Sequence, residues 1–107
     1  MTKSSKAIYR KGDAFSKLAK ARGFRSRSAL KLLEIQKKDN FIKPSSRILD
    51  LGSSPGGWSQ VCLQIVGKKG FIFSVDKKIM EPLKGVNYLN KELEKLKESD
   101  FENFDKN

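Results

Sequence analysis

A short apolar run that ends in a glycine-rich turn constrains the fold of this chain more than any other stretch. Residues 47–51 (RILDL) are typical of a buried β-strand, and the turn GSSPGGW follows at 52–58. A second strand, FIFSV, is predicted at 71–75. Between the two strands runs an apolar stripe at helical spacing, formed by Trp58, Val61, Cys62, Ile65 and Val66. Strand, helix and strand in this order predict an α/β fold with a parallel, doubly wound sheet.

Further elements are predicted on both sides of this unit. The segment 13–22 has the composition of a short helix, with Asp13 as its N-cap and Gly23 at its end. The other predicted elements are a helix at 28–38, a weaker strand at 85–89 and a polar helix at 92–99. A chain of 107 residues has room for one domain.

The helix that follows the turn is expected to begin inside it. Ser54 can cap this helix, and Pro55 suits its first turn. Trp58 lies on the apolar stripe, so a position in the core is favoured over contact with a ligand, and both remain open.

Composition excludes several classes of site. The chain has one cysteine, Cys62, and no histidine, which rules out an internal disulfide, a zinc site and a histidine-dependent catalytic triad. No apolar run approaches the roughly 20 residues of a membrane span, and no secretory signal is visible. A cytoplasmic protein with no metal and no membrane partner is therefore expected.

The positive charge is concentrated at the N-terminal end. Residues 1–47 carry 14 Lys and Arg against three Asp and Glu, whereas residues 48–107 carry nine of each kind. In the helix at 28–38, exposed positions are expected on one face, formed by Arg27, Lys31, Glu34 and Lys38. A basic arm of this kind is typical of a protein that binds a polyanion such as RNA.

The turn at 52–58 does not match the common phosphate-binding loops. Trp58 stands where a Walker A loop needs lysine, and the glycines do not have the spacing of the dinucleotide fingerprint. A cationic ligand without phosphate, such as S-adenosylmethionine, fits better, because Asp50 would attract its charge. Gly52, Gly56 and Gly57 would let the backbone approach its amino-acid end. Asp76, at the end of the second strand, is placed to accept the ribose hydroxyls.

Simpler explanations stay open for the acidic residues. Glu92 would approach the adenine at the end of the third strand, but it is equally an ordinary acid at a helix N-terminus. Asp50 is also explained as a cap of the turn, and Asp76 as a solvated residue at a strand end.

Three motifs together resemble the FtsJ/RrmJ family of RNA ribose 2′-O-methyltransferases. They are RSRSALKL at 25–32, DLGSSPGGWSQ at 50–60 and VDKKIMEP at 75–82, and the resemblance runs from about residue 19 to residue 93. It implies a Rossmann-like, S-adenosylmethionine-dependent methyltransferase that acts on RNA, with a uridine of large-subunit ribosomal RNA as the favoured target. The donor site implied by the resemblance is formed by Gly56, Gly57, Trp58, Asp76 and Glu92.

The resemblance also assigns roles in the basic part. Lys31 matches the first member of a Lys-Asp-Lys-Glu catalytic tetrad, and a phosphate contact is the alternative for this residue. Independently of the resemblance, the clustered basic charge predicts RNA contacts from Arg22, Arg25, Arg27 and Lys38. The chain then divides into a basic, RNA-facing arm with helices at 1–46 and the first half of a donor-binding α/β domain at 47–107.

The other three residues of the tetrad have no counterpart in this sequence. The chain is expected to be the N-terminal half of such an enzyme, as a fragment or a shortened gene product, with about three strands and low stability alone. The first strand would then lie at an open edge, where a partner chain could complete the sheet. A non-catalytic RNA-binding remnant is the alternative function.

Overall fold

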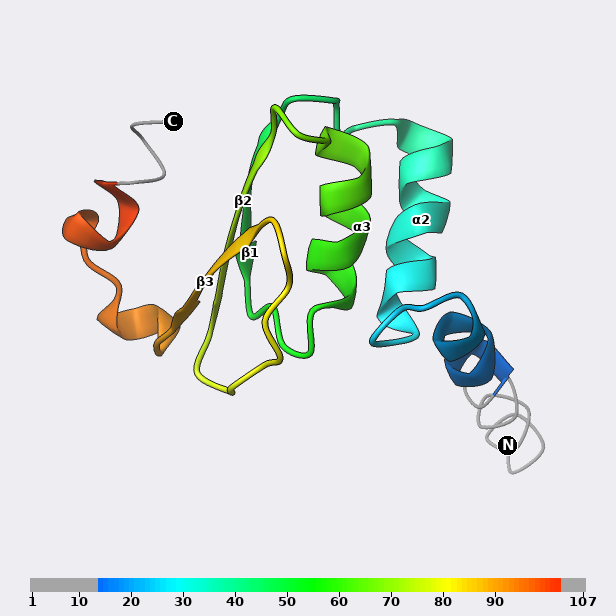
Figure 1. Cartoon of the computed structure of the whole chain (residues 1–107), viewed down its shortest axis with the longest axis horizontal. Coiled ribbons are helices and arrows are strands. Elements are labelled where there is room, and N and C mark those ends of the chain that lie inside the picture. The colour runs from blue at the N-terminus through cyan, green and yellow to red at the C-terminus, as the bar shows by residue number, and fades with distance from the viewer. Residues whose placement is uncertain (1–13, 103–107) are drawn as a thin grey trace, which may run out of the picture.

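The computed structural model describes residues 14–102 (Figure 1). Residues 14–21 are helical, and the expected cap Asp13 lies outside the described part of the chain. The remaining elements are α2 (Ser28–Asp39), β1 (Arg47–Leu51), α3 (Gly57–Val66), β2 (Phe71–Asp76), β3 (Val86–Asn90) and two short 3₁₀ helices, η1 (Leu93–Lys95) and η2 (Glu98–Phe101).

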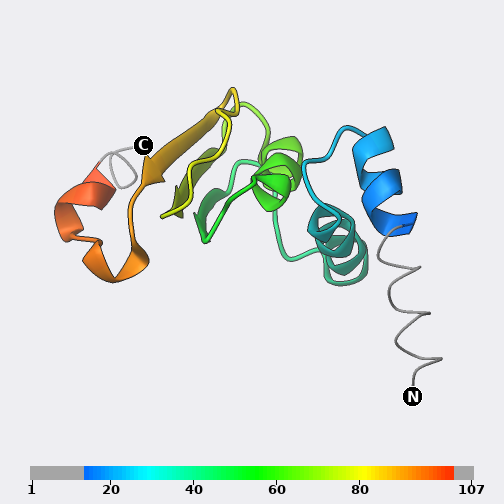
Figure 2. The same ribbon diagram turned by 90° about the horizontal axis from the view of Figure 1, so that it is seen from below.

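The sheet contains three parallel strands in the order β1-β2-β3, with β2 in the centre. Leu49 pairs with Phe73, and Phe73 pairs with Asn87. Helix α3 covers one face of the sheet, α2 packs on the outer side of α3, and the helix of residues 14–21 lies beyond α2 (Figures 1 and 2). The predicted α/β fold with parallel strands is confirmed.

The core lies between α2, α3 and the covered face of the sheet. Its buried side chains come from each layer, and they include Ala29, Leu32, Val61, Cys62, Val66 and Ile72. Burying a side chain of the size of Leu32 contributes about 2 kcal/mol. The periodic apolar stripe of α3 is what brings the helix onto the sheet.

Two turns set the ends of α2. Gly23 adopts a positive φ of 83° after the first helix, which allows the chain to reverse into α2. At the other end Asn40 is left-handed and its N–H donates to the Gln36 carbonyl at 2.7 Å. The Gln36 side chain also exchanges two hydrogen bonds with the backbone of Ile42, so the path from α2 to β1 is fixed.

Strand β1 is less buried than its sequence predicts. Leu49 is 39% exposed and Leu51 is 49% exposed, because both lie on the face of the sheet opposite α3. Within the described part of the chain, that face is covered near β2, where the ring of Phe101 from η2 packs edge-on against Phe73 at 5.7 Å.

Two further predictions are wrong in detail. Helix α3 begins at Gly57 rather than around Pro55, because Gly56 has a φ of 116° that no helical residue adopts; the peptide bond before Pro55 is cis. The α-helix expected at 92–99 is replaced by η1 and η2, because Leu96 and Lys97 between them are extended. None of the helices in residues 14–102 is long and apolar enough to cross a bilayer.

Candidate functional site

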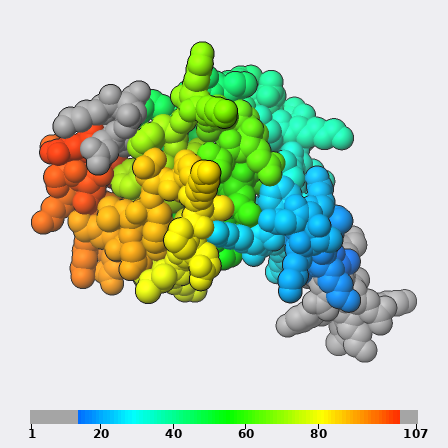
Figure 3. All heavy atoms as spheres, viewed as in Figure 1, coloured from blue at the N-terminus to red at the C-terminus, as the bar shows by residue number. Residues whose placement is uncertain are grey.

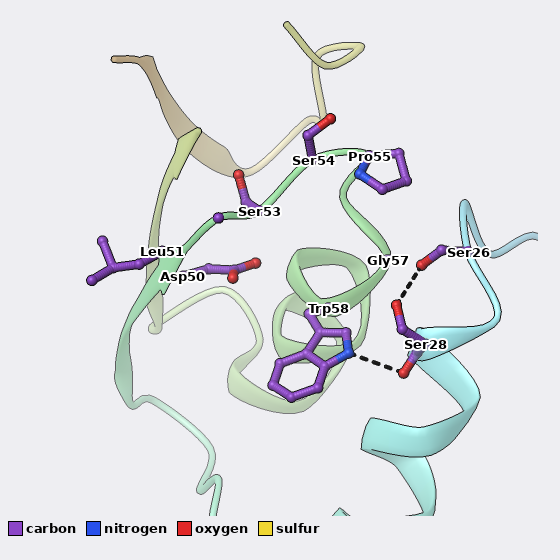
Figure 4. A pocket seen from close by; sticks show the side chains of 10 residues that line it. Ser26, Ser28, Asp50, Leu51, Ser53, Ser54, Pro55, Gly57 and Trp58 are labelled. Atoms are coloured by element: carbon purple, nitrogen blue, oxygen red, sulfur yellow. Dashed lines mark hydrogen bonds between the residues drawn. The ribbon is translucent and has the colours of Figure 1, made fainter. Parts of the chain in front are cut away.

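A pocket of about 330 Å³ lies at the carboxyl end of β1, where ligands bind in open α/β sheets. Figure 4 shows that its walls come from three places: the approach to α2, the end of β1 with the loop after it, and the first turn of α3. The lining residues are Ser26, Ser28, Asp50, Leu51, Gly52, Ser53, Ser54, Pro55, Gly57 and Trp58.

Asp50 places a carboxylate in the pocket wall. Its Oδ2 accepts a hydrogen bond from the Ser59 hydroxyl at 2.6 Å, and the Ser59 and Ser74 hydroxyls lie 2.6 Å apart. Burial raises the pKa of Asp50, the Ser59 hydrogen bond opposes this, and the charge of Asp76 adds to it. The ionised form of Asp50 is therefore energetically costly without a partner, and a bound cation would stabilise it.

Both carboxylate oxygens of Asp76, at the end of β2, accept hydrogen bonds from the backbone. Its Oδ2 accepts the Ser54 N–H at 2.8 Å and its Oδ1 accepts the Lys78 N–H at 2.9 Å. These hydrogen bonds, the one from Lys78 first, hold the pKa of Asp76 below its ordinary value. Asp76 does not line the pocket but fastens the loop that does.

The same loop is fastened to β2 by the backbone. The Val75 carbonyl accepts the N–H groups of Gly52 and Ser53 at 2.7 and 3.1 Å. The loop from 52 to 54 is thus held by three hydrogen bonds to the end of β2, counting the one from Ser54 to Asp76, and the pocket floor is preorganised.

The glycine pair of the turn serves the packing of α3 against the start of α2. A Cβ on Gly57 would lie 2.2 Å from the Ser26 hydroxyl oxygen, which no real side chain tolerates. A Cβ on Gly56 would lie 3.1 Å from a guanidinium nitrogen of Arg25, and its φ of 116° favours glycine independently. Of the two, only Gly57 lines the pocket.

Trp58 lies at the rim of the pocket and not in the core, so the favoured prediction for it is wrong. Its side chain is 41% exposed, and its indole N–H donates to the Ser28 carbonyl at 3.0 Å (Figure 4). Trp58 stands in the first turn of α3, where its indole contacts the start of α2. The indole therefore forms a pocket wall.

Other predicted site residues lie outside the pocket lining. Glu92 is half-buried before η1 with its carboxylate 3.5 Å from the Lys95 amine. Lys31 is exposed on α2, one turn after Ser28. The side chains of Arg22, Arg27 and Lys38 are also exposed. No group of three or more metal-binding side chains occurs among residues 14–102.

Arg25 differs from the other basic residues. Its guanidinium donates to the carbonyl oxygens of Pro55, Glu81 and Pro82. Sequence reasoning placed Arg25 among the RNA contacts and missed Ser26 and Ser28 as parts of the pocket wall. The cluster RSRS at the start of α2 was the available signal, because serines at a helix start often bond locally instead of facing solvent.

Comparisons with known proteins agree with this geometry. A family profile described as FtsJ-like methyltransferase matches residues 24–106. The chain is 49% identical over 77 residues to a ribosomal RNA large subunit methyltransferase E of Marinobacter nauticus, covering 72% of this chain and 37% of the relative. It is 43% identical over 90 residues to the protein of the same name from Dechloromonas aromatica, covering 82% and 44%.

One solved structure is similar as well. The crystal structure of a Plasmodium falciparum protein described as a ribosomal RNA methyltransferase matches with a TM-score of 0.62 and 42% identity, over 67% of this chain and 40% of that one. The chain spans about two fifths of the length of the relatives it matches. The match over residues 24–106, together with the fold and the pocket, shows that the chain belongs to the family of FtsJ-like methyltransferases.

Proposed function

We propose that this chain provides the donor pocket and the first RNA-binding helix of an S-adenosylmethionine-dependent RNA ribose 2′-O-methyltransferase. The favoured substrate is a uridine of large-subunit ribosomal RNA, which also fits the cytoplasmic location expected from the sequence. The observation that carries the proposal is the pocket at the end of β1, with the Asp50 carboxylate in its wall and the Trp58 indole at its rim. The names of the two bacterial relatives support the choice of RNA.

The residues of the pocket fit the cationic end of S-adenosylmethionine. Asp50 supplies a carboxylate in a partly buried wall, where attraction to a sulfonium and an ammonium is stronger than in water. Trp58 adds an aromatic face, which attracts cations. The methyl group on a sulfonium is electrophilic, and the task of the chain is to orient it.

The ribose and adenine contacts remain part of the proposal. Asp76 uses one lone pair of each carboxylate oxygen for the backbone, so both oxygens retain capacity to accept a ribose hydroxyl. Its lowered pKa keeps it ionised for this purpose. Glu92 is assigned to the adenine by family resemblance alone.

RNA is proposed to bind along the exposed face of α2. Lys31 would hold the ribose 2′-hydroxyl, and it lies next to Ser28 on the helix surface, since residues three apart are neighbours. Arg22, Arg27 and Lys38 are exposed and would contact phosphates. The division into an RNA-facing part at 1–46 and a donor-binding part at 47–107 remains a prediction.

Donor binding by the pocket is directly measurable because Trp58 is the single tryptophan. S-Adenosylmethionine is titrated into the protein while the emission of Trp58 is followed. We expect a saturable change, and we expect Asp50→Asn to weaken the affinity about tenfold, the value of one charged contact. The asparagine oxygen still accepts the Ser59 hydroxyl, so the fold is retained.

Glu94→Gln is the matched control, because it removes one negative charge from an exposed site in η1. It should leave donor affinity unchanged. RNA affinity is measured in parallel and should fall steeply with salt in every variant. RNA binding without any donor response would favour the non-catalytic RNA-binding alternative, and the absence of both would contradict both functions.

A further inference from the structure

One guanidinium joins three segments that are distant in the sequence. Nη1 of Arg25 donates to the Pro55 carbonyl at 3.1 Å and also to the Glu81 carbonyl, and Nη2 donates to the Pro82 carbonyl at 2.8 Å. The segments are the approach to α2, the pocket loop and the stretch after β2. Figure 3 shows the first and last of these in contact at the surface, in blue and yellow.

The backbone at Arg25 is held as well, by the side chain of Gln60. Its N–H donates to Oε1 of Gln60 in α3 at 2.8 Å, and Nε2 of Gln60 donates to the Gly23 carbonyl at 3.0 Å. Arg25 is therefore fixed at both ends: its backbone is tied to α3, and its side chain to the pocket loop.

The surroundings of the guanidinium are shaped for arginine. Gly56 passes so close that a Cβ there would lie 3.1 Å from Nη1 and 3.3 Å from Cδ of Arg25. Three carbonyl acceptors also match a rigid fork of several N–H groups, whereas a lysine amine is a single point donor. Charge alone does not explain the site.

The position of this contact matters because the pocket has two halves. One half belongs to the approach to α2, through Ser26 and Ser28, and the other to the loop at 50–58. The Arg25 contacts connect the two halves, together with the Trp58–Ser28 hydrogen bond and the close packing of Gly57 against Ser26. They also fix α2, and with it Lys31, relative to the pocket.

We propose that Arg25 is a positioning residue that holds the RNA-facing helix α2 and the donor pocket in one geometry, rather than an RNA contact. This role rests on the proposed function of the pocket. Through Arg25, binding at the pocket and the placement of Lys31 depend on the same set of hydrogen bonds.

The test compares Arg25→Lys with Arg27→Lys, which changes an exposed arginine two residues away. Acrylamide quenching of Trp58 is measured without ligand, and the affinities for S-adenosylmethionine and for RNA are measured at one salt concentration. Arg25→Lys should increase quenching and weaken donor affinity about tenfold, the value of one or two charged hydrogen bonds. RNA affinity should change less than twofold because the charge is kept, and Arg27→Lys should alter neither donor affinity nor quenching.

Each result decides the inference. Unchanged quenching in Arg25→Lys overturns it, and a loss of RNA affinity with unchanged quenching identifies Arg25 as an RNA contact. If S-adenosylmethionine does not change the Trp58 emission of the wild-type protein, the proposed function fails. Acrylamide quenching of Trp58 without ligand still tests the positioning role of Arg25. If Arg25→Lys does not fold, Gln60→Ala releases the backbone end of the same contact and should increase quenching; no increase overturns the inference.

Discussion

Two aspartates at the ends of neighbouring strands show how burial and hydrogen bonding divide similar residues between tasks. Burial raises the pKa of Asp50, whereas backbone N–H groups lower the pKa of Asp76. Among residues 14–102 no ion pair involves Asp50, whereas Asp76 accepts two backbone hydrogen bonds that fasten the pocket loop. Asp50 is therefore suited to attract a cationic ligand, and Asp76 combines the fastening of the loop with its proposed role toward the ribose.

Asp76→Ala should lower the free energy of unfolding by about 1 kcal/mol at pH 7, the net value of an ordinary hydrogen bond. A carboxyl whose pKa is lowered in the folded state stabilises the fold above its unfolded pKa, and this stabilisation is lost as the pH falls through the folded value. The difference between wild type and variant should therefore shrink as the pH falls below about 4. Urea unfolding at pH 7 and pH 3 measures it.

Glu34→Ala removes an exposed acid from α2 and serves as the control, with a change within about 0.5 kcal/mol. A loss in Asp76→Ala that is as large at pH 3 as at pH 7 would show that the loop does not depend on the charge of Asp76.

The sequence predicted some of the residues that line the pocket and missed others. Asp50, Gly57 and Trp58 do line it, because strand ends and glycine turns are local features that a sequence displays. Ser26 and Ser28 were missed, because their approach depends on how α2 packs against α3. That contact joins residues about 30 positions apart, and no local pattern encodes it.

At the scale of elements, periodic segments were predicted well. Helices α2 and α3 and all three strands lie within three residues of their expected bounds, because the spacing of their apolar residues indicates which side of each element is buried. The segment 92–99 has only Leu93 and Leu96 to bury, and its charged residues do not form a separate polar face. Its two turns are set instead by tertiary contacts such as the ion pair of Lys91 with Asp100 at 2.8 Å.

The packing of α3 against the approach to α2 predicts the effect of one methyl group. Gly57→Ala places a Cβ where the Ser26 hydroxyl lies, so it should destabilise the protein by about 1–3 kcal/mol, the usual cost of overpacking. Thermal and urea unfolding measure the loss.

A second substitution identifies the cause. Ser26→Ala removes the clashing oxygen and leaves the nearest remaining carbons 3.4 Å away, so the double variant should recover most of the loss. Gln64→Ala, at an exposed position of α3, should have little effect. A double variant as unstable as Gly57→Ala would point to the helix start itself rather than to Ser26.

On the scale of the whole molecule, α3 covers one face of the sheet, whereas among residues 14–102 the other face is covered only near β2. Leu49 and Leu51 are exposed on this other face, and among the described residues no strand pairs with the outer edge of β1. Exposed apolar edges promote pairing between copies, while the net charge of +11 opposes it.

Self-association should therefore rise with protein concentration and with salt, because salt screens the repulsion. Leu49→Lys should shift the association to several-fold higher concentration, since a lysine on an edge strand disfavours pairing. Sedimentation velocity at low and high salt measures this. Lys84→Leu is the control, because it makes the reverse exchange at an exposed position away from β1. If wild type and Leu49→Lys associate equally, the β1 face is excluded as the origin of the association.

The central position of β2 has a consequence for synthesis on the ribosome. Strand β1 finds its only described strand partner in β2, and the Val75 carbonyl of β2 holds the pocket loop. Neither the sheet nor the pocket can therefore form until the chain has emerged past Asp76. Until then the basic residues 1–47 of the nascent chain have no completed core to pack against. They are exposed within reach of the RNA of the ribosome that is making the chain.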